Sequence, residues 1–166
     1  MVPSNNPRMA TWARLAVVNR SREGEAGTYP VNYRGHWENT QELYVFNTHL
    51  FDRKDQQLAK LNGARLILER INALDRFGEW TQLRPVFLLG DFNSRPGGEV
   101  YRVLVDDEDS DDSRMLKDSM EGVSGIDWVL FRGDVKVLSG EIVDDNVDGV
   151  YASDHKPIHV EFRIND

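Results

Sequence analysis

The chain has 166 residues, no cysteine and a net charge of −8, with 40% hydrophobic and 29% charged residues. This length and composition predict one soluble globular domain with a buried core, and they exclude disulfides and thiolate metal sites. No apolar stretch approaches the roughly 18 residues of a membrane span, and no signal peptide follows Met1, although the compartment stays open. The negative charge disfavours tight, nonspecific binding to duplex DNA, but bound metal ions would still allow an acidic protein to cleave phosphodiesters.

Two strands separated by a long polar stretch are expected at the start of the chain. The apolar character of Met9–Val18 and Leu43–Asn47 predicts strands, whereas the glycines and the proline in Asn19–Glu42 predict a long loop or an exposed hairpin. His49 follows the second strand, near the place where α/β sheets present functional side chains.

The segment after His49 predicts an amphipathic helix that leads into a buried strand. Asp55 is the expected cap and Gly78 the expected stop. The apolar run Pro85–Leu89 is typical of a strand that is buried on both faces, and a right-handed crossover would place His49 and Asp91 at one edge of the sheet. The apolar residues of the helix recur at spacings of three and four, at Leu58, Leu61, Ala64, Leu68, Ile71 and Leu74.

The residues after this strand have the side chains most suited to chemistry. Gly90 allows a sharp turn or a close approach of the backbone to a ligand. Asp91 and Asn93 are a carboxylate and a carboxamide two residues apart, which can bind a hard cation and a phosphate oxygen. The alternative interpretation is an Asp-Asn turn that only closes the strand.

The second half of the chain is predicted to alternate short elements with loops. The acidic run Asp106–Asp112 lacks the spaced ligands and central glycine of an EF-hand loop, so a solvated loop is expected instead of a calcium site. The strand at Val135–Val143 is expected to pair with the strand before it through a turn at Gly133-Asp134. The other expected elements are a helix at Glu99–Val105, a strand at Ile126–Phe131, a loop at Tyr151–Pro157 and a half-exposed strand at Ile158–Ile164.

One acidic residue lies inside an apolar strand. An isolated carboxylate such as Asp127 is costly to bury unless it is paired, and a histidine is a fitting partner because the imidazole gains a fixed tautomer and a higher pKa. His159 falls on the polar face of the last strand and is not expected to act. The candidate site residues are therefore those near strand ends: His49, Asp91, Asn93, Asp127, Asp154 and His155.

Four short motifs together resemble the endonuclease/exonuclease/phosphatase superfamily, which includes deoxyribonuclease I, exonuclease III, neutral sphingomyelinases and inositol polyphosphate 5-phosphatases. The Gly-Asp-Phe-Asn and Ser-Asp-His motifs are specific in combination, and the resemblance extends from Met9 to Ile164. The motifs, in the superfamily's order and rough spacing, are Asn47-Thr48-His49-Leu50, Gly90-Asp91-Phe92-Asn93, Ile126-Asp127-Trp128 and Ser153-Asp154-His155-Lys156-Pro157.

The resemblance implies a four-layer α/β sandwich, like that of deoxyribonuclease I, which hydrolyses phosphoesters with Mg²⁺ or Mn²⁺. The implied roles divide into proton transfer, phosphate binding and metal binding. Asp91 would orient or deprotonate the attacking water and bind the metal, and Asp154 would bind the metal or lie in its outer shell. Asp127 would orient His155, which would contact the phosphate and transfer a proton. Asn93 would hold a phosphate oxygen, and His49 would donate to the phosphate or the leaving group.

The chain departs from the superfamily pattern in two places. In relatives, an Asn and the metal-binding Glu of a Gln-Glu motif come in a segment that would precede Met9 in this chain. Gln41-Glu42 has the right letters but directly precedes the strand of His49, which is the wrong place in the order of the motifs, so Glu42 is expected to be a surface residue. The stretch between Asp118 and Ile126 is short, which implies reduced substrate-facing loops. We therefore expect residues 9–166 to be the carboxyl-terminal two-thirds of a domain, with a loose lead at 1–8.

A truncated sheet exposes its edges, so a partner chain, a homodimer or an upstream segment is expected to complete it. The functional hypothesis is a metal-dependent phosphoester hydrolase whose substrate is small or lipid-like rather than duplex DNA. The alternative is a non-catalytic relative that serves as a binding or scaffold module. A Rossmann-type nucleotide site is excluded, because Gly90-Asp91-Phe92-Asn93 lacks the G-x-G-x-x-G spacing.

Overall fold

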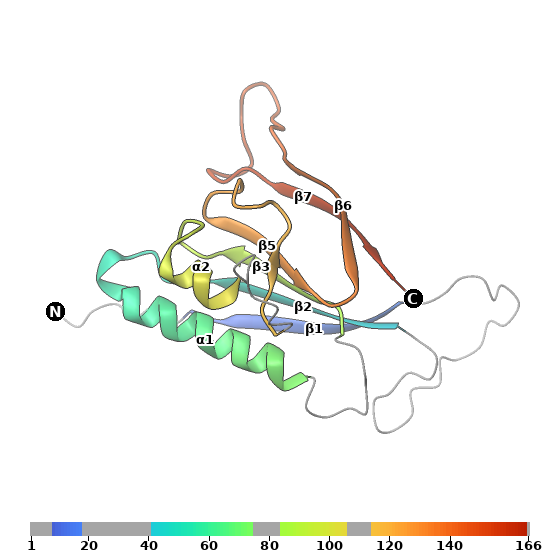
Figure 1. Cartoon of the computed structure of the whole chain (residues 1–166). Helices are drawn as coiled ribbons and strands as arrows, with labels where there is room; N and C mark the ends of the chain where they lie inside the picture. Colours follow the sequence, from blue (N-terminus) through green and yellow to red (C-terminus); the bar gives the residue numbers. More distant parts are fainter. Residues whose placement is uncertain (1–7, 18–40, 75–83, 106–113, 166) are drawn as a thin grey trace, which may run out of the picture.

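The computed structural model describes residues 8–17, 41–74, 84–105 and 114–165 (Figure 1). The N-terminal lead apart from its last residue, nearly all of the expected loop at Asn19–Glu42, the expected helix stop at Gly78 and the acidic run at Asp106–Asp112 lie outside these residues.

A mixed five-stranded sheet forms the centre of the molecule. Its strand order is β1-β2-β3-β5-β4, in which β2 and β3 are parallel and every other neighbouring pair is antiparallel. The parallel pair confirms the βαβ prediction, because His49 faces Asp91 across it. The strands are β1 (Ala10–Val17), β2 (Gln41–His49), β3 (Val86–Asp91), β4 (Lys117–Asp118) and β5 (Asp127–Arg132).

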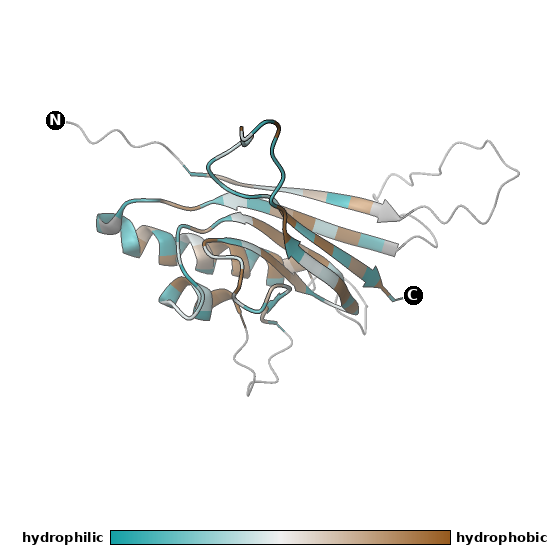
Figure 2. Ribbon diagram, turned by 90° about the horizontal axis from the view of Figure 1, so that it is seen from above, coloured by the Kyte–Doolittle hydropathy of each residue, from teal (hydrophilic) through white to brown (hydrophobic). Residues whose placement is uncertain are grey.

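Two helices pack on one face of this sheet. The turn η1 (Lys54–Gln56) leads into α1 (Gln57–Ala73), and α2 (Glu99–Leu104) packs beside α1. The main core lies between these helices and the sheet, and Figure 2 shows hydrophobic residues concentrated along the central strands. Its fully buried members include Ala64, Ile71, Val86, Leu88, Phe92, Val100, Leu104, Trp128 and Leu130.

The amphipathic pattern of α1 is confirmed along most of its length. Three details differ. Asp55 lies in η1 and its side chain caps nothing, and Leu58 is exposed. The third difference is Lys60, which is not among the apolar positions of the helical pattern but is buried in the structure.

A second, two-stranded sheet covers part of the opposite face. Antiparallel β6 (Val135–Ile142) and β7 (Ile158–Ile164) form it, and the Phe162 ring lies 4.8 Å from that of Phe87 and 5.5 Å from that of Phe131. Phe87 alternates along β3 with Val86 and Leu88, whose side chains face the helices, so the two-stranded sheet and the helices lie on opposite sides.

The predicted pairing of β6 with the strand before it is wrong, because β6 pairs with β7. The cause is the turn at Gly133, whose φ is +98° and whose Cα packs so tightly that an added Cβ would lie 2.9 Å from the Arg84 carbonyl oxygen. The Val135 N–H then donates to the Gly133 carbonyl at 2.8 Å. This tight turn directs the chain out of the central sheet before a hairpin can form.

The layers confirm the α/β fold class. Helices, five-stranded sheet and two-stranded sheet give three of the four expected sandwich layers within the described ranges. No described helix is long and apolar enough to cross a membrane.

Candidate active site

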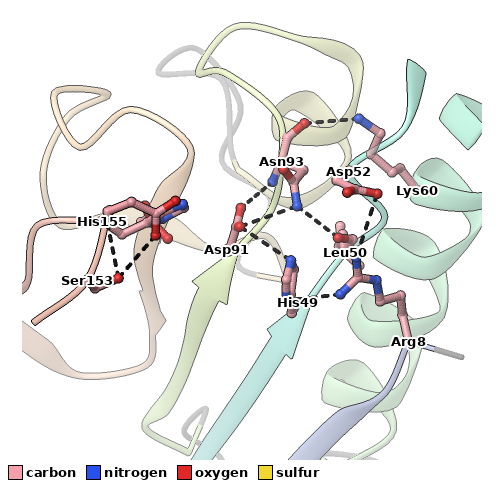
Figure 3. Close-up of polar contacts among 11 residues, drawn as sticks. Arg8, His49, Leu50, Asp52, Lys60, Asp91, Asn93, Ser153 and His155 are labelled. Atoms are coloured by element: carbon pink, nitrogen blue, oxygen red, sulfur yellow. Dashed lines mark hydrogen bonds and ion pairs between the residues drawn. The ribbon is translucent and has the colours of Figure 1, made fainter. Parts of the chain in front are cut away.

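Three adjacent strands bring candidate residues together at one edge of the central sheet. The register places His49 of β2 opposite Asp91 of β3, and Asp91 opposite Asp127 of β5. Because β5 runs antiparallel to β3, Asp127 lies at the start of its strand while Asp91 lies at the end of its own. His155 reaches the same edge from the loop between β6 and β7 (Figure 3).

Asp127 and His155 form the shortest described side-chain contact at this edge. The His155 Nδ1 lies 2.7 Å from the Asp127 Oδ2, and the His155 backbone N–H donates to the Ser153 hydroxyl at 3.1 Å. The hydrogen bond and the charge of Asp127 raise the pKa of His155 above its ordinary value, partial desolvation opposes this, and the charges of Asp91 and Asp154 add to it. The pair therefore favours an imidazolium whose Nδ1 proton is held by Asp127.

Asn93 holds the Asp91 carboxylate in place. Its backbone N–H donates to Asp91 Oδ1 at 2.8 Å, and its side-chain Nδ2 lies 3.3 Å from Asp91 Oδ2 and 3.0 Å from the Leu50 carbonyl oxygen. This geometry combines an Asx turn with direct support of the carboxylate. Because both Nδ2 hydrogens face protein acceptors, Asn93 would have to exchange one of these contacts to bind a phosphate oxygen.

Gly90 permits a close approach, but the approach is to a neighbouring strand. Its φ is +142°, and a Cβ at this position would lie 1.8 Å from the Thr48 carbonyl oxygen in β2. The glycine thus allows β2 and β3 to meet closely just before Asp91.

His49 connects the carboxylate to a residue that the sequence pattern did not single out. Its Nε2 lies 3.4 Å from Asp91 Oδ2, and its Nδ1 lies 3.1 Å from Nη1 of Arg8. A guanidinium only donates hydrogen bonds, so Nδ1 accepts and the neutral ring carries its proton on Nε2, facing Asp91. Arg8, whose Nη2 lies 3.7 Å from Asp52, was expected in the loose lead and instead contacts the site.

A buried aromatic pair supports the loop that carries Asn93. Phe92 and Trp128 stack with ring centroids 4.4 Å apart, and both are almost fully buried. The Phe92 N–H donates to the Ile126 carbonyl at 2.9 Å, and the Trp128 indole donates to the Gly125 carbonyl at 3.0 Å. Asp91 and Asp127 directly precede Phe92 and Trp128 in the sequence, so this buried pair holds the backbone that carries both carboxylates.

Three ligand groups lie close enough to share a cation. Ligand atoms of Asp91, Asp127 and His155 all lie within 4.8 Å of one another. The carboxylates suit Mg²⁺ or Mn²⁺, whereas His155 can bind a cation only when its ring is neutral. Asp154, the other residue expected to bind metal, lies outside this cluster: it is exposed, and its Oδ1 accepts a hydrogen bond from the Ser153 hydroxyl at 3.4 Å.

Glu42 lies at the opposite end of β2 from His49. Its side chain is only 11% exposed and pairs with Arg84 at 3.4 Å and Arg14 at 3.9 Å, so the prediction of a surface residue is wrong. These ion pairs account for its burial. Its place in the sheet keeps it away from the cluster.

An apolar groove leads to the cluster. The space between the central sheet and β7 has a volume of about 680 Å³ and reaches Asp91, Asp127 and His155 at one end. Its apolar walls come from alternate residues of four strands, including Leu43, Val45, Phe87, Leu89, Val129 and Val160.

A family model described as the endonuclease/exonuclease/phosphatase family matches residues 61–155, more than half of the chain. The chain belongs to this family. The matched range includes Asp91, Asn93, Asp127 and His155, but not His49. A search of curated protein sequences finds no match.

Solved structures show the same fold. An endonuclease/exonuclease/phosphatase from Bacteroides vulgatus is 21% identical, with a TM-score of 0.63 over 95% of this chain and 56% of its own. A mannosyl-6-phosphatase from Bacteroides thetaiotaomicron is 22% identical, with a TM-score of 0.59 over 75% of this chain and 52% of its own. The human Nocturnin catalytic domain, which holds a sulfate anion, is 19% identical, with a TM-score of 0.59 over 77% and 49%. The chain thus spans about half the length of these proteins.

Proposed function

We propose that this chain is the metal-dependent phosphoester hydrolase module of its family, with the reaction centred on the edge shared by β2, β3 and β5. The observation that carries the proposal is the His155–Asp127 pair at 2.7 Å beside the Asp91 carboxylate. A carboxylate that accepts the proton of the water and an imidazolium that protonates the leaving oxygen are two groups that can catalyse the hydrolysis of a phosphoester.

In the proposed reaction, Asp91 orients the attacking water and accepts its proton as the new oxygen–phosphorus bond forms. His155 gives a proton to the leaving oxygen as the old bond breaks, and Asp127 stabilises the imidazolium before this transfer. His49 would donate from Nε2, and Asn93 from Nδ2, to non-bridging phosphate oxygens.

Asp91 would hold Mg²⁺ or Mn²⁺ together with neighbouring oxygen ligands, and Asp154 would lie in the outer shell. When bound, such an ion neutralises charge on the phosphoryl oxygens. The donor set fits this assignment, because the cluster offers two carboxylates within 4.8 Å.

We infer a small or lipid-like phosphoester as the substrate, in preference to duplex DNA. The net charge of −8 opposes binding of a polyanion, and the groove beside the cluster is mainly apolar. A phosphate ester of an apolar or compact alcohol would suit both the negative charge of the protein and the apolar groove. Among proteins of similar fold, one is a mannosyl-6-phosphatase.

The chain spans about half the length of the similar structures, which favours a site that further polypeptide completes. We propose that an upstream segment or a second copy of the chain supplies the remaining groups, and that the 166-residue chain alone binds metal weakly and turns over slowly. This same observation favours the second candidate, a scaffold module without activity.

Hydrolysis of bis(p-nitrophenyl) phosphate with Mn²⁺, measured on the chain together with the polypeptide that completes its site, separates the two candidates. The Asp91→Asn and His155→Ala variants should each lose about 100-fold or more of the wild-type rate, because each removes a proton-transfer group. Glu69→Gln is the control, since Glu69 is exposed on α1, which packs on the opposite face of the central sheet from the groove. A wild-type rate equal to that of Asp91→Asn would support the scaffold and refute the hydrolase.

A further inference from the structure

The helix α1 carries a positive charge on its buried face. Lys60 is only 6% exposed and lies one turn before the buried Ala64. A lysine on a helix normally extends its ammonium to water, because burial of the charge is costly. Here the ammonium turns toward the site loop and donates to the Asn93 carbonyl at 3.0 Å (Figure 3).

The acceptor of this hydrogen bond has an unusual backbone conformation. Asn93 has a φ of +47°, in the left-handed region, which asparagine adopts more readily than other non-glycine residues because its side chain can form local hydrogen bonds. Such a conformation costs free energy and persists only when the surroundings hold it in place. Lys60 holds the carbonyl side of Asn93, while the Asn93 amide groups hold Asp91.

We propose that Lys60 is a positioning residue for Asp91, acting through Asn93; this rests on the hydrolase function proposed above. The chain of contacts runs from the ammonium to the Asn93 carbonyl, and from the Asn93 N–H to Asp91 Oδ1 at 2.8 Å. Loss of the first contact leaves the Asn93 peptide free to leave its strained conformation, which would turn the Asp91 carboxylate away from the attacking water.

A packing role alone does not need an ammonium. If Lys60 only packed, Lys60→Met should leave the free energy of unfolding unchanged or raise it, because methionine has nearly the same length and volume as lysine and carries no charge to desolvate. The positioning role predicts that the same variant keeps its fold but has a lower kcat.

The first test compares Lys60→Met with Lys60→Arg, which keeps a charged donor, and with Arg65→Met, which removes a charge from the exposed face of α1. Lys60→Met should lower kcat for bis(p-nitrophenyl) phosphate by about 10- to 100-fold with KM changed less than about twofold, since misplacement of a reacting group acts on the chemical step. Lys60→Arg should recover a large part of the loss, and Arg65→Met should match the wild type.

The second test does not depend on activity. Hydrogen exchange of the Asn93 backbone amide should be at least about tenfold faster in Lys60→Met than in wild type or Lys60→Arg, at equal global stability. Unchanged exchange would overturn the proposal. An unchanged kcat in Lys60→Met, with Asp91→Asn inactive, would also overturn the positioning role of Lys60 but leave the hydrolase function intact. Equal rates for wild type and Asp91→Asn would refute the hydrolase function. Hydrogen exchange of the Asn93 amide would then decide the role of Lys60.

Discussion

The Asp127 carboxylate accepts a hydrogen bond from the His155 imidazole across 28 positions of sequence, at an Nδ1–Oδ2 distance of 2.7 Å. This contact explains why an acidic residue begins the strand β5, whose next four residues are apolar. It also fixes which ring nitrogen of His155 is available to a ligand, because Nδ1 is occupied by Asp127 and only Nε2 remains.

The first prediction concerns the protonation of His155. Because Asp127 raises the pKa of His155, the folded, metal-free protein should hold this proton to a higher pH than a free histidine, whose pKa is about 6.5. The stabilisation from the pair is then fully present below that pH and is lost as pH rises through the folded-state pKa. An NMR titration of the His155 ring protons measures this value.

Asp127→Asn should lower the measured pKa of His155, since it replaces a charged acceptor with a neutral one. Glu141→Gln is the control, because Glu141 pairs with His159 on the exposed face of the two-stranded sheet. Identical His155 titrations in wild type and Asp127→Asn would contradict the assigned contact.

The second prediction concerns metal affinity. Asp91→Asn should weaken Mn²⁺ binding at least about tenfold, whereas Asp154→Asn should weaken it less, because Asp154 lies outside the cluster of ligand atoms. Asp144→Asn removes an exposed carboxylate that is paired with Lys156, and serves as the control. Isothermal titration with Mn²⁺ gives the affinities, and a larger loss for Asp154→Asn than for Asp91→Asn would reverse the assignment.

The third prediction concerns Arg8. Arg8→Met removes the donor to His49 Nδ1 and leaves a ring that is 53% exposed free to rotate, so kcat/KM for a diester should fall by about tenfold. Arg53→Met is a matched control, because Arg53 is in an exposed ion pair with Asp55 of the kind that contributes about 1 kcal/mol or less. Equal losses in both variants would show that the effect is one of charge alone.

The fourth prediction concerns the packing of β2 against β3. Gly90→Ala would place a Cβ 1.8 Å from the Thr48 carbonyl oxygen, so we expect a loss of about 3 kcal/mol or more in the free energy of unfolding. Gly97→Ala also has a positive φ, of +76°, but meets no atom within 4 Å, and should cost only about 1 to 2 kcal/mol. Urea unfolding measures both, and similar losses would show that backbone strain outweighs the clash.

The parallel part of the fold was predictable from sequence because its signals are local. Apolar runs, a helix of regular spacing and a short crossover are enough to place His49 and Asp91 side by side, and the register confirms this. The pairing of β6 was not predictable, because the compact turn at Gly133 can join a hairpin or lead to another layer. Tertiary packing against Arg84 decides between these outcomes.

The two basic residues near the site were missed for different reasons. Lys60 occupies a position on a helix whose pattern predicts a solvated lysine, and only the fold of the Asn93 loop over α1 supplies an acceptor for it. Arg8 lies in a polar, proline-containing stretch, and its contact with His49 depends on the antiparallel pairing of β1 with β2. Neither the contact of Lys60 with Asn93 nor that of Arg8 with His49 has a signature in the local sequence.

The proposed proton donor and the residue that would orient it are carried by separate sheets, since His155 lies in the loop between β6 and β7 and Asp127 lies on β5. His155 arrives with the β6–β7 layer, which meets the central sheet largely through the rings of Phe162, Phe87 and Phe131. In the proposed reaction the acid is available only while the β6–β7 layer is docked: a molecule in which this layer has loosened keeps its helices, its main core and Asp91, but has no group placed to protonate a departing alcohol. The rate of turnover would then report a loosening of this layer that a measurement of helical content does not detect.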